Sequence, residues 1–319
     1  MRPLILILML GLAACQAGLV DQVTPPPARP STDADGIITQ RATIATVLPT
    51  HSPRAGNFTP PPLSPPANLP AVLRLPPGEG RVPAVIVVHG TSGVQTGGPA
   101  AMARLLTRAG FATLETDSWT PRGVDPANNR GQRPGTLGAL PDMYGALRFL
   151  AAHPRVDPAR IGIMGWSWGG IVALRAAREE VQQAYAGAGP RFAAFVAFYP
   201  GCSLWVPGEG VTAGEFDTGW PTGPLLILAA GRDDYDLRRG AADCTAFLAA
   251  IPGGPPARAS LHVYPNATHG WDVRVGQSAW DPAARNLRGG TVTFTPDPGV
   301  TEDSQARLLA FMRRHLMGQ

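Results

Sequence analysis

A G-x-S-x-G motif lies at residues 165–169, between a short apolar run at 160–164 and a helical pattern at 170–178. A strand, a sharp turn and a helix in this order constrain the fold strongly. The turn holds its serine in a strained backbone conformation, and the small residues on either side let strand and helix pass closely. The hydroxyl of Ser167 is then presented at the tip of the turn, which favours a nucleophilic serine.

Apolar runs typical of strands alternate with helical patterns along the chain. Strands are expected at residues 71–75, 84–88, 111–116, 160–164, 192–198, 225–229 and 261–264. Helices are expected at residues 99–108, 140–153, 239–250 and 302–316. The alternation predicts an α/β fold with a mostly parallel, doubly wound sheet flanked by helices. We expect one domain over residues 66–319, with its site at the carboxyl ends of the strands.

A serine nucleophile needs a base within hydrogen-bond reach, and the base needs an acid that orients it. In the α/β-hydrolase fold these follow in the order Ser, Asp or Glu, His. Of the six histidines, His269 alone follows the last expected strand on a loop, so it is the predicted base. The loop after strand 225–229 supplies the acid. Counting residues from Pro224 along the strand favours Asp233 as the acid, and counting from Gly231 favours Asp234. Asp233 is therefore preferred and Asp234 is the alternative.

Two backbone amides are candidates for stabilising an oxyanion. The first is the amide of Trp168, which follows the nucleophile at the start of the next helix. The second is the amide of Thr91, in the loop H-G-T-S-G at residues 89–93 after a central strand. Glycines in that loop permit close approach of the backbone, and backbone donors need no particular side chain.

The N-terminus is typical of an export signal. A positive residue is followed by an apolar stretch at 3–12, which is much shorter than the ~20 residues of a spanning helix. Small residues then precede Cys15, as in a bacterial lipoprotein signal. We therefore expect a signal peptide at residues 1–14, lipid on Cys15, and an exported protein held at the membrane in the cell envelope. Residues 15–65 are rich in proline and are expected to be a tether, with a possible edge strand at 37–47.

Composition excludes some partners and allows one cross-link. The net charge is +4, the 27 basic residues are all arginine, and they are scattered, so no nucleic-acid partner is expected. With Cys15 lipidated, Cys202 and Cys244 remain as an even pair in an oxidising compartment. They could form a disulfide or stay as two buried thiols.

From residue 69 to 316 the chain resembles the dienelactone hydrolase family of α/β-hydrolases. The resemblance rests on V-V-H-G at 87–90, D-S-W-T-P-R-G at 117–123, the segment 160–170 around Ser167, and Y-P-N-A-T-H-G-W at 264–271. It implies hydrolysis of ester or lactone bonds through Ser or Cys, Asp and His, without a metal or other cofactor. The founding enzymes use a cysteine nucleophile in the cytoplasm, so the serine and the export signal put dienelactone itself in doubt as the substrate.

Three further side chains are candidates for contacting substrate. Trp119 and Trp271 are expected to line an aromatic pocket, and Arg122 is expected either to bind a substrate carboxylate or to pair with a neighbouring acid. The predicted function is a serine hydrolase that cleaves a small ester or lactone through an acyl-enzyme. The alternatives are a non-catalytic envelope lipoprotein that uses the fold for binding, and a hydrolase of small peptides or amides.

Overall fold

The structure is a computed structural model, and it describes residues 29–47, 66–125, 135–210, 215–216, 219–238 and 241–319. The predicted signal peptide, Cys15 and most of the proline-rich tether lie outside these residues. Within them, no helix combines the length and the apolar character needed to cross a bilayer.

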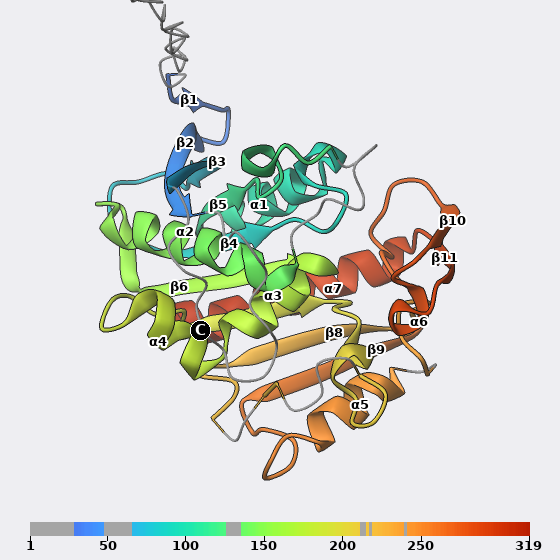
Figure 1. The fold of residues 1–319 in the computed structure, drawn as a ribbon. Helices are drawn as coiled ribbons and strands as arrows, with labels where there is room; N and C mark the ends of the chain where they lie inside the picture. The colour runs from blue at the N-terminus through green and yellow to red at the C-terminus, as the bar shows by residue number, and fades with distance from the viewer. Residues whose placement is uncertain (1–28, 48–65, 126–134, 211–214, 217–218, 239–240) are drawn as a thin grey trace, which may run out of the picture.

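A nine-stranded sheet in the order β1-β2-β3-β5-β4-β6-β7-β8-β9 forms the centre of the molecule (Figure 1). Its strands are β1 (Ser31–Thr32), β2 (Ile38–Val47), β3 (Pro66–Leu75), β4 (Val82–Val88), β5 (Ala112–Thr116), β6 (Val156–Trp166), β7 (Ala194–Phe198), β8 (Leu225–Arg232) and β9 (Ala259–Thr268). The strands from β5 to β9 run parallel, whereas β1, β2 and β3 pair antiparallel at one edge. The predicted mostly parallel α/β sheet is confirmed.

Helices cover both faces of this sheet. They are α1 (Gly98–Arg108), α2 (Leu140–Ala152), α3 (Trp168–Ala176), α4 (Glu179–Ala186), α5 (Ala242–Ala249) and α7 (Pro298–Met312), with short helices η1 (Val94–Thr96), η2 (Thr120–Arg122), η4 (Thr136–Ala139), η5 (Cys202–Trp205) and η6 (Arg313–Met317). In β4, Ile86 joins the core under α2 and α3, while Val85 and Val87 join the core under α1 and α7. This two-sided burial explains why central strands are continuous apolar runs.

Two features differ from the sequence expectation. The strand expected at 37–47 exists as β2, but it pairs with β3 over ten residues and has β1 outside it, so the sheet begins before residue 66. The chain also forms an unpredicted hairpin between His269 and α7. Its strands are β10 (Gln277–Asp281) and β11 (Gly290–Phe294), joined by a turn that contains α6 (Ala284–Leu287).

Candidate active site

Ser167 occupies the sharp turn between β6 and α3. Its backbone has φ 51° and ψ −115°, an unfavourable region for a residue with a side chain. The Ser167 amide donates to the Phe198 carbonyl at the end of β7, at 2.9 Å, which fixes the turn to the neighbouring strand. A Cβ added to Gly165 would overlap the backbone of Gly169. The close passage of strand and helix therefore requires glycine, as the motif predicts.

The structure brings Ser167, His269 and Asp233 into one hydrogen-bonded chain. Nε2 of His269 lies 2.8 Å from Oγ of Ser167, and Nδ1 of His269 lies 2.7 Å from Oδ2 of Asp233. The histidine is only 3% exposed and the aspartate 8%. A neutral imidazole with Nδ1–H directed at a carboxylate leaves Nε2 free to accept the serine proton. The arrangement can thus activate the hydroxyl for attack on a carbonyl.

Asp234, the alternative acid, faces away from this chain. Its Oδ2 accepts the backbone N–H of Thr293 in β11 at 2.9 Å, and its own carbonyl accepts the N–H of Arg285. Asp233 also accepts the Tyr235 amide through its second oxygen, at 2.9 Å. The loop therefore uses its two adjacent carboxylates differently, one toward His269 and one to attach the hairpin.

Two tyrosines hold the His269 ring edge-on. Tyr199 lies 4.7 Å and Tyr235 4.4 Å from it between ring centroids. The Tyr199 hydroxyl donates to Asp272 at 2.5 Å, and the Tyr235 hydroxyl donates to Asp281 at 2.9 Å. Burial and the nearby Asp272 charge raise the pKa of Tyr199, so it stays neutral.

Sequence reasoning missed both tyrosines. For Tyr199 a signal existed, because it directly follows a strand at the carboxyl edge of the sheet, next to the nucleophile turn. For Tyr235 the only signal was its place in the acid loop.

His89 orders the loop that carries Thr91. Its Nε2 accepts the Ser118 amide at 3.1 Å, so its proton is on Nδ1, which donates to the Gly90 carbonyl at 2.7 Å. That carbonyl belongs to the same peptide unit as the Thr91 N–H, and in a trans peptide the two groups point in opposite directions. A Cβ added to Gly90 would lie 3.7 Å from Cβ of Ser167. The loop is therefore held against the nucleophile.

Trp119 has a different place from the one expected. Its side chain is 2% exposed, and its indole N–H donates to the Thr91 carbonyl at 3.3 Å. It also packs on His89 and Trp168, at 4.7 and 4.6 Å between ring centroids. A buried indole N–H requires an internal acceptor, and here the acceptor is the Thr91 carbonyl. The indole therefore packs under the loop and helps to hold it in place. This corrects the expectation that Trp119 faces a substrate.

Arg122 and Trp271 also depart from the role of contacting substrate. The Arg122 guanidinium donates to both oxygens of Asp142, at 2.8 and 3.2 Å, and to the carbonyls of Ser118 and Gly138. Burial raises the pKa of Asp142, and the Arg122 charge offsets part of that effect. Of the two expectations for Arg122, the ion pair is the one observed.

Trp271 is fully buried, and its indole N–H donates to the Ser304 hydroxyl in α7, so it belongs to the core.

A disulfide joins Cys202 in η5 to Cys244 in α5. It lies beside the acid loop, because the amide of the next residue, Ser203, donates to Oδ1 of Asp236 at 2.9 Å. Burial, together with the charge of Asp233, raises the pKa of Asp236 well above its ordinary value. The sequence left the cysteine pair open between a bond and two thiols, and the structure contains the bond.

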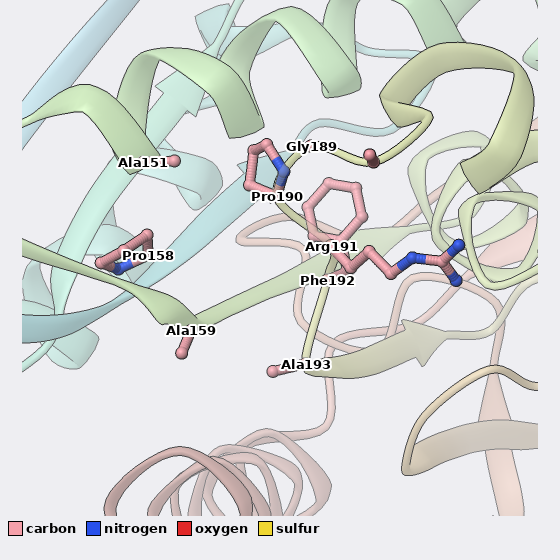
Figure 2. Close-up of a pocket in the computed structure, with 9 residues that line it drawn as sticks. Ala151, Pro158, Ala159, Gly189, Pro190, Arg191, Phe192 and Ala193 are labelled. Atoms are coloured by element: carbon pink, nitrogen blue, oxygen red, sulfur yellow. The ribbon is translucent and has the colours of Figure 1, made fainter.

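An open groove of about 610 Å³ lies at the opposite end of the sheet. Figure 2 shows Ala159 near the start of β6, Ala193 just before β7, and Arg191 beside them. These are the amino ends of the strands, whereas Ser167 lies at a carboxyl end. The Arg191 guanidinium is occupied by both oxygens of Glu179, at 2.8 and 2.9 Å. The groove is therefore separate from the candidate active site.

The sheet order, the strained serine turn and the loop positions define an α/β-hydrolase fold. Residues 69–315 match the profile of the dienelactone hydrolase family, and the chain belongs to this family.

Similar proteins include a probable 2-oxo-3-(5-oxofuran-2-ylidene)propanoate lactonase from a Bradyrhizobium species. It is 36% identical over 114 residues, which is 34% of this chain and 46% of that protein, so the match spans about half of the curated relative.

Solved structures share the fold. A dienelactone hydrolase-like structure from Klebsiella pneumoniae is 20% identical, covering 86% of this chain and 99% of that one, with a TM-score of 0.52. Esterase 2 of Thermogutta terrifontis, phosphorylated by paraoxon, is 14% identical, covering 77% of this chain and 88% of that one, also with a TM-score of 0.52.

Proposed function

We propose that this protein is a serine-dependent carboxylic ester hydrolase acting on small esters or lactones. The observation that carries the proposal is the hydrogen-bonded chain from Ser167 through His269 to Asp233 at the carboxyl edge of the sheet. Membership of the dienelactone hydrolase family supports the same chemistry. The Bradyrhizobium relative is named as a lactonase, so lactones are the first substrates to test.

The proposed reaction begins when Oγ of Ser167 attacks the ester carbonyl carbon. Its proton passes to Nε2 of His269, and the Asp233 carboxylate stabilises the imidazolium through Nδ1–H. The carbonyl oxygen becomes an oxyanion that accepts hydrogen bonds from the amides of Trp168 and Thr91. The intermediate then collapses, the C–O bond to the leaving group breaks, and His269 gives the proton to the departing oxygen.

Water completes the cycle. It loses a proton to His269 as it attacks the acyl-enzyme, and collapse of the second intermediate releases the acid and returns the proton to Ser167. A lactone differs only in that its leaving oxygen stays attached to the acyl chain, so the product is a hydroxy acid. The start of α3 contributes its positive end to both oxyanions, because Trp168 is its first residue.

An activity-based probe tests the nucleophile. A fluorophosphonate should label the wild-type protein, and Ser167→Ala should lose both labelling and hydrolysis of short p-nitrophenyl esters, by about 10⁴-fold or more. Ser278→Ala is a matched control, since Ser278 is an exposed serine in the hairpin and should remain labelled at Ser167. Hydrolysis by Ser167→Ala at the wild-type rate would refute the mechanism. A wild-type protein that neither labels nor hydrolyses any ester would favour a binding role.

The proposed location is the cell envelope, with lipid on Cys15 and the enzyme domain outside the cytoplasm. The N-terminal sequence pattern supports it, and the bond between Cys202 and Cys244 is typical of an oxidising compartment. Mass spectrometry of the mature N-terminus is the test. Residues 1–14 retained on the mature chain would overturn the proposal.

A further inference from the structure

The hairpin beside His269 carries an unusual concentration of exposed apolar side chains. In the part of the chain that the structure describes, the large hydrophobic residues with high exposure are Val275 at 77%, Trp280 at 65% and Leu287 at 57%. All three lie within thirteen positions of one another, between the predicted base and α7. Single exposed apolar residues need no explanation, but a group confined to one segment indicates a binding surface.

The strand register shows which way Trp280 faces. Because side chains alternate along a strand, residues opposite one another in the hairpin share a face. On one face Val292 is buried and Phe294 lies 5.9 Å from the His269 ring, so this face is directed inward. Trp280 is opposite Thr291 on the other face. The tryptophan is therefore directed away from the molecule.

The turn of the hairpin presents Leu287 by an unfavourable backbone conformation. Arg285, Asn286 and Leu287 have φ of 51°, 54° and 66°, and each such non-glycine residue costs roughly 1–2 kcal/mol. Asn286 holds the turn in place. Its side-chain amide donates to the Glu209 carbonyl at 2.7 Å, and its backbone N–H donates to the backbone carbonyl of Tyr235 at 2.9 Å. With Asn286 fixed inward, its neighbour Leu287 projects into solvent.

Charge on the hairpin is divided between its two sides. Arg274, Arg285 and Arg288 are exposed, and none forms an ion pair within the described residues. The nearby carboxylates are turned inward instead, Asp272 to the Tyr199 hydroxyl and Asp281 to the Tyr235 hydroxyl. The outer surface is consequently apolar and cationic at once.

We propose that this outer surface, termed here the hairpin face, binds the surface of an anionic lipid bilayer. It consists of Trp280 and Leu287 with Arg285 and Arg288, and the exposed Val275 and Arg274 lie just before β10 at its border. Tryptophan side chains favour the interface between lipid and water. Arginine forms hydrogen bonds with lipid phosphates and is attracted to the negative charge of the bilayer surface.

Docking on the hairpin face would hold the active site close to the bilayer. The hairpin is attached to the acid loop by the Thr293 amide on Asp234 and by the Tyr235 hydroxyl on Asp281. Figure 1 shows it at the periphery of the molecule, beyond the carboxyl end of β8 and to one side of the sheet. The inference concerns binding alone and does not depend on the proposed function.

Vesicle sedimentation tests the inference, using the full chain with Cys15→Ser in every sample so that lipidation is the same throughout. Vesicles contain phosphatidylcholine alone or with phosphatidylglycerol. Trp280→Ser with Leu287→Ser should lower partitioning onto the anionic vesicles by about tenfold or more. Arg285→Gln with Arg288→Gln should lower it about fivefold for each arginine removed, and only on anionic vesicles.

The matched control is Arg313→Gln with Arg314→Gln, which removes the same charge beside the amino end of β6, where Leu316 accepts from Arg160. It should bind as the wild type does. Equal binding by all variants would overturn the inference, as would equal loss in the control. A dimer in sedimentation velocity that is abolished by the Trp280 and Leu287 substitutions would also overturn it, because the face would then bind a second copy. Thermal melting monitored by circular dichroism verifies that each variant is folded.

Discussion

The groups on the two sides of Ser167 differ in chemistry. On one side, the loop after β4 offers backbone amides, and neutral buried groups hold it in place: the His89 ring and the indole of Trp119. On the other side, Nδ1 of His269 faces the Asp233 carboxylate, and the two tyrosines that flank its ring donate their hydroxyls to two further carboxylates. On the first side, hydrogen bonds orient the peptide unit that carries the Thr91 amide donor. On the second side, the negative charge of Asp233 holds His269, the proton acceptor, in place.

Because of this difference, substitutions on the two sides should reduce activity to different extents. Backbone donors survive most substitutions, so damage to the loop side should be partial and should depend on what supports the loop. A carboxylate that stabilises an imidazolium has no substitute, so damage to the base side should be severe at one position and slight at its neighbours. The three aspartates Asp233, Asp234 and Asp236 allow that difference to be measured within four residues.

The largest expected effect separates Asp233 from Asp234. Asp233→Asn should lower kcat by about 10³–10⁴-fold with little change in KM, because His269 loses the charge that stabilises its protonated form. Asp234→Asn keeps an oxygen that can accept the Thr293 amide, so its kcat should stay within several-fold of the wild type. Steady-state kinetics on a short p-nitrophenyl ester measures both. The reverse ranking would transfer the role of acid to Asp234.

A smaller effect is expected from the opposite side, at His89. His89→Gln places its amide where Nε2 was and leaves the Gly90 carbonyl without its donor, so kcat should fall about 10²-fold. His89→Asn places an N–H close to the former Nδ1 and should retain several-fold more activity. Kinetics with kcat and KM determined separately compares the pair, alongside urea unfolding to correct for stability. Equal activity of both variants would show that the His89–Gly90 hydrogen bond does not position the loop.

Much of the fold and part of the site follow from the sequence alone. Strands, helices and the motif around Ser167 depend on local patterns of apolar residues and glycine, and the observed sheet follows them. The position of His269 after the last sheet strand follows from the order of elements. The choice between Asp233 and Asp234 does not, because β8 is irregular between Ala230 and Arg232, which makes counting along the strand ambiguous.

Interactions between distant residues account for the remaining differences. Arg122 is paired with Asp142 twenty positions away, and nothing in its own segment distinguishes that partner from a substrate carboxylate. The turn at 285–287 is left-handed without glycine, a conformation that the sequence alone disfavours. It is maintained by the contact from Asn286 to Glu209, seventy-seven positions away. Local rules fail where such long-range contacts determine the backbone.

The smallest expected effect concerns stability at Asp236, the buried carboxyl beside the predicted acid. Burial and the charge of Asp233 raise its pKa above the ordinary 3.8, so the folded protein favours the neutral form. Below 3.8 the folded and unfolded states are both protonated. As pH rises above this value the unfolded chain loses the proton more readily, so the contribution of Asp236 to stability declines through its folded pKa. Asp236→Asn, neutral throughout and able to accept the Ser203 amide, should avoid that loss.

The variant should therefore match the wild type near pH 3 and become progressively more stable than it toward neutral pH. Urea unfolding across this range measures the difference in free energy, and the acidic end is its internal control. The effect should appear in stability while kcat changes little, because Asp236 accepts from Ser203 and lies outside the hydrogen-bonded chain to Ser167. A constant difference at every pH would mean that the substitution acts through packing. A large loss of kcat would extend the charged side of the site to a third aspartate and make the contrast between its two sides sharper.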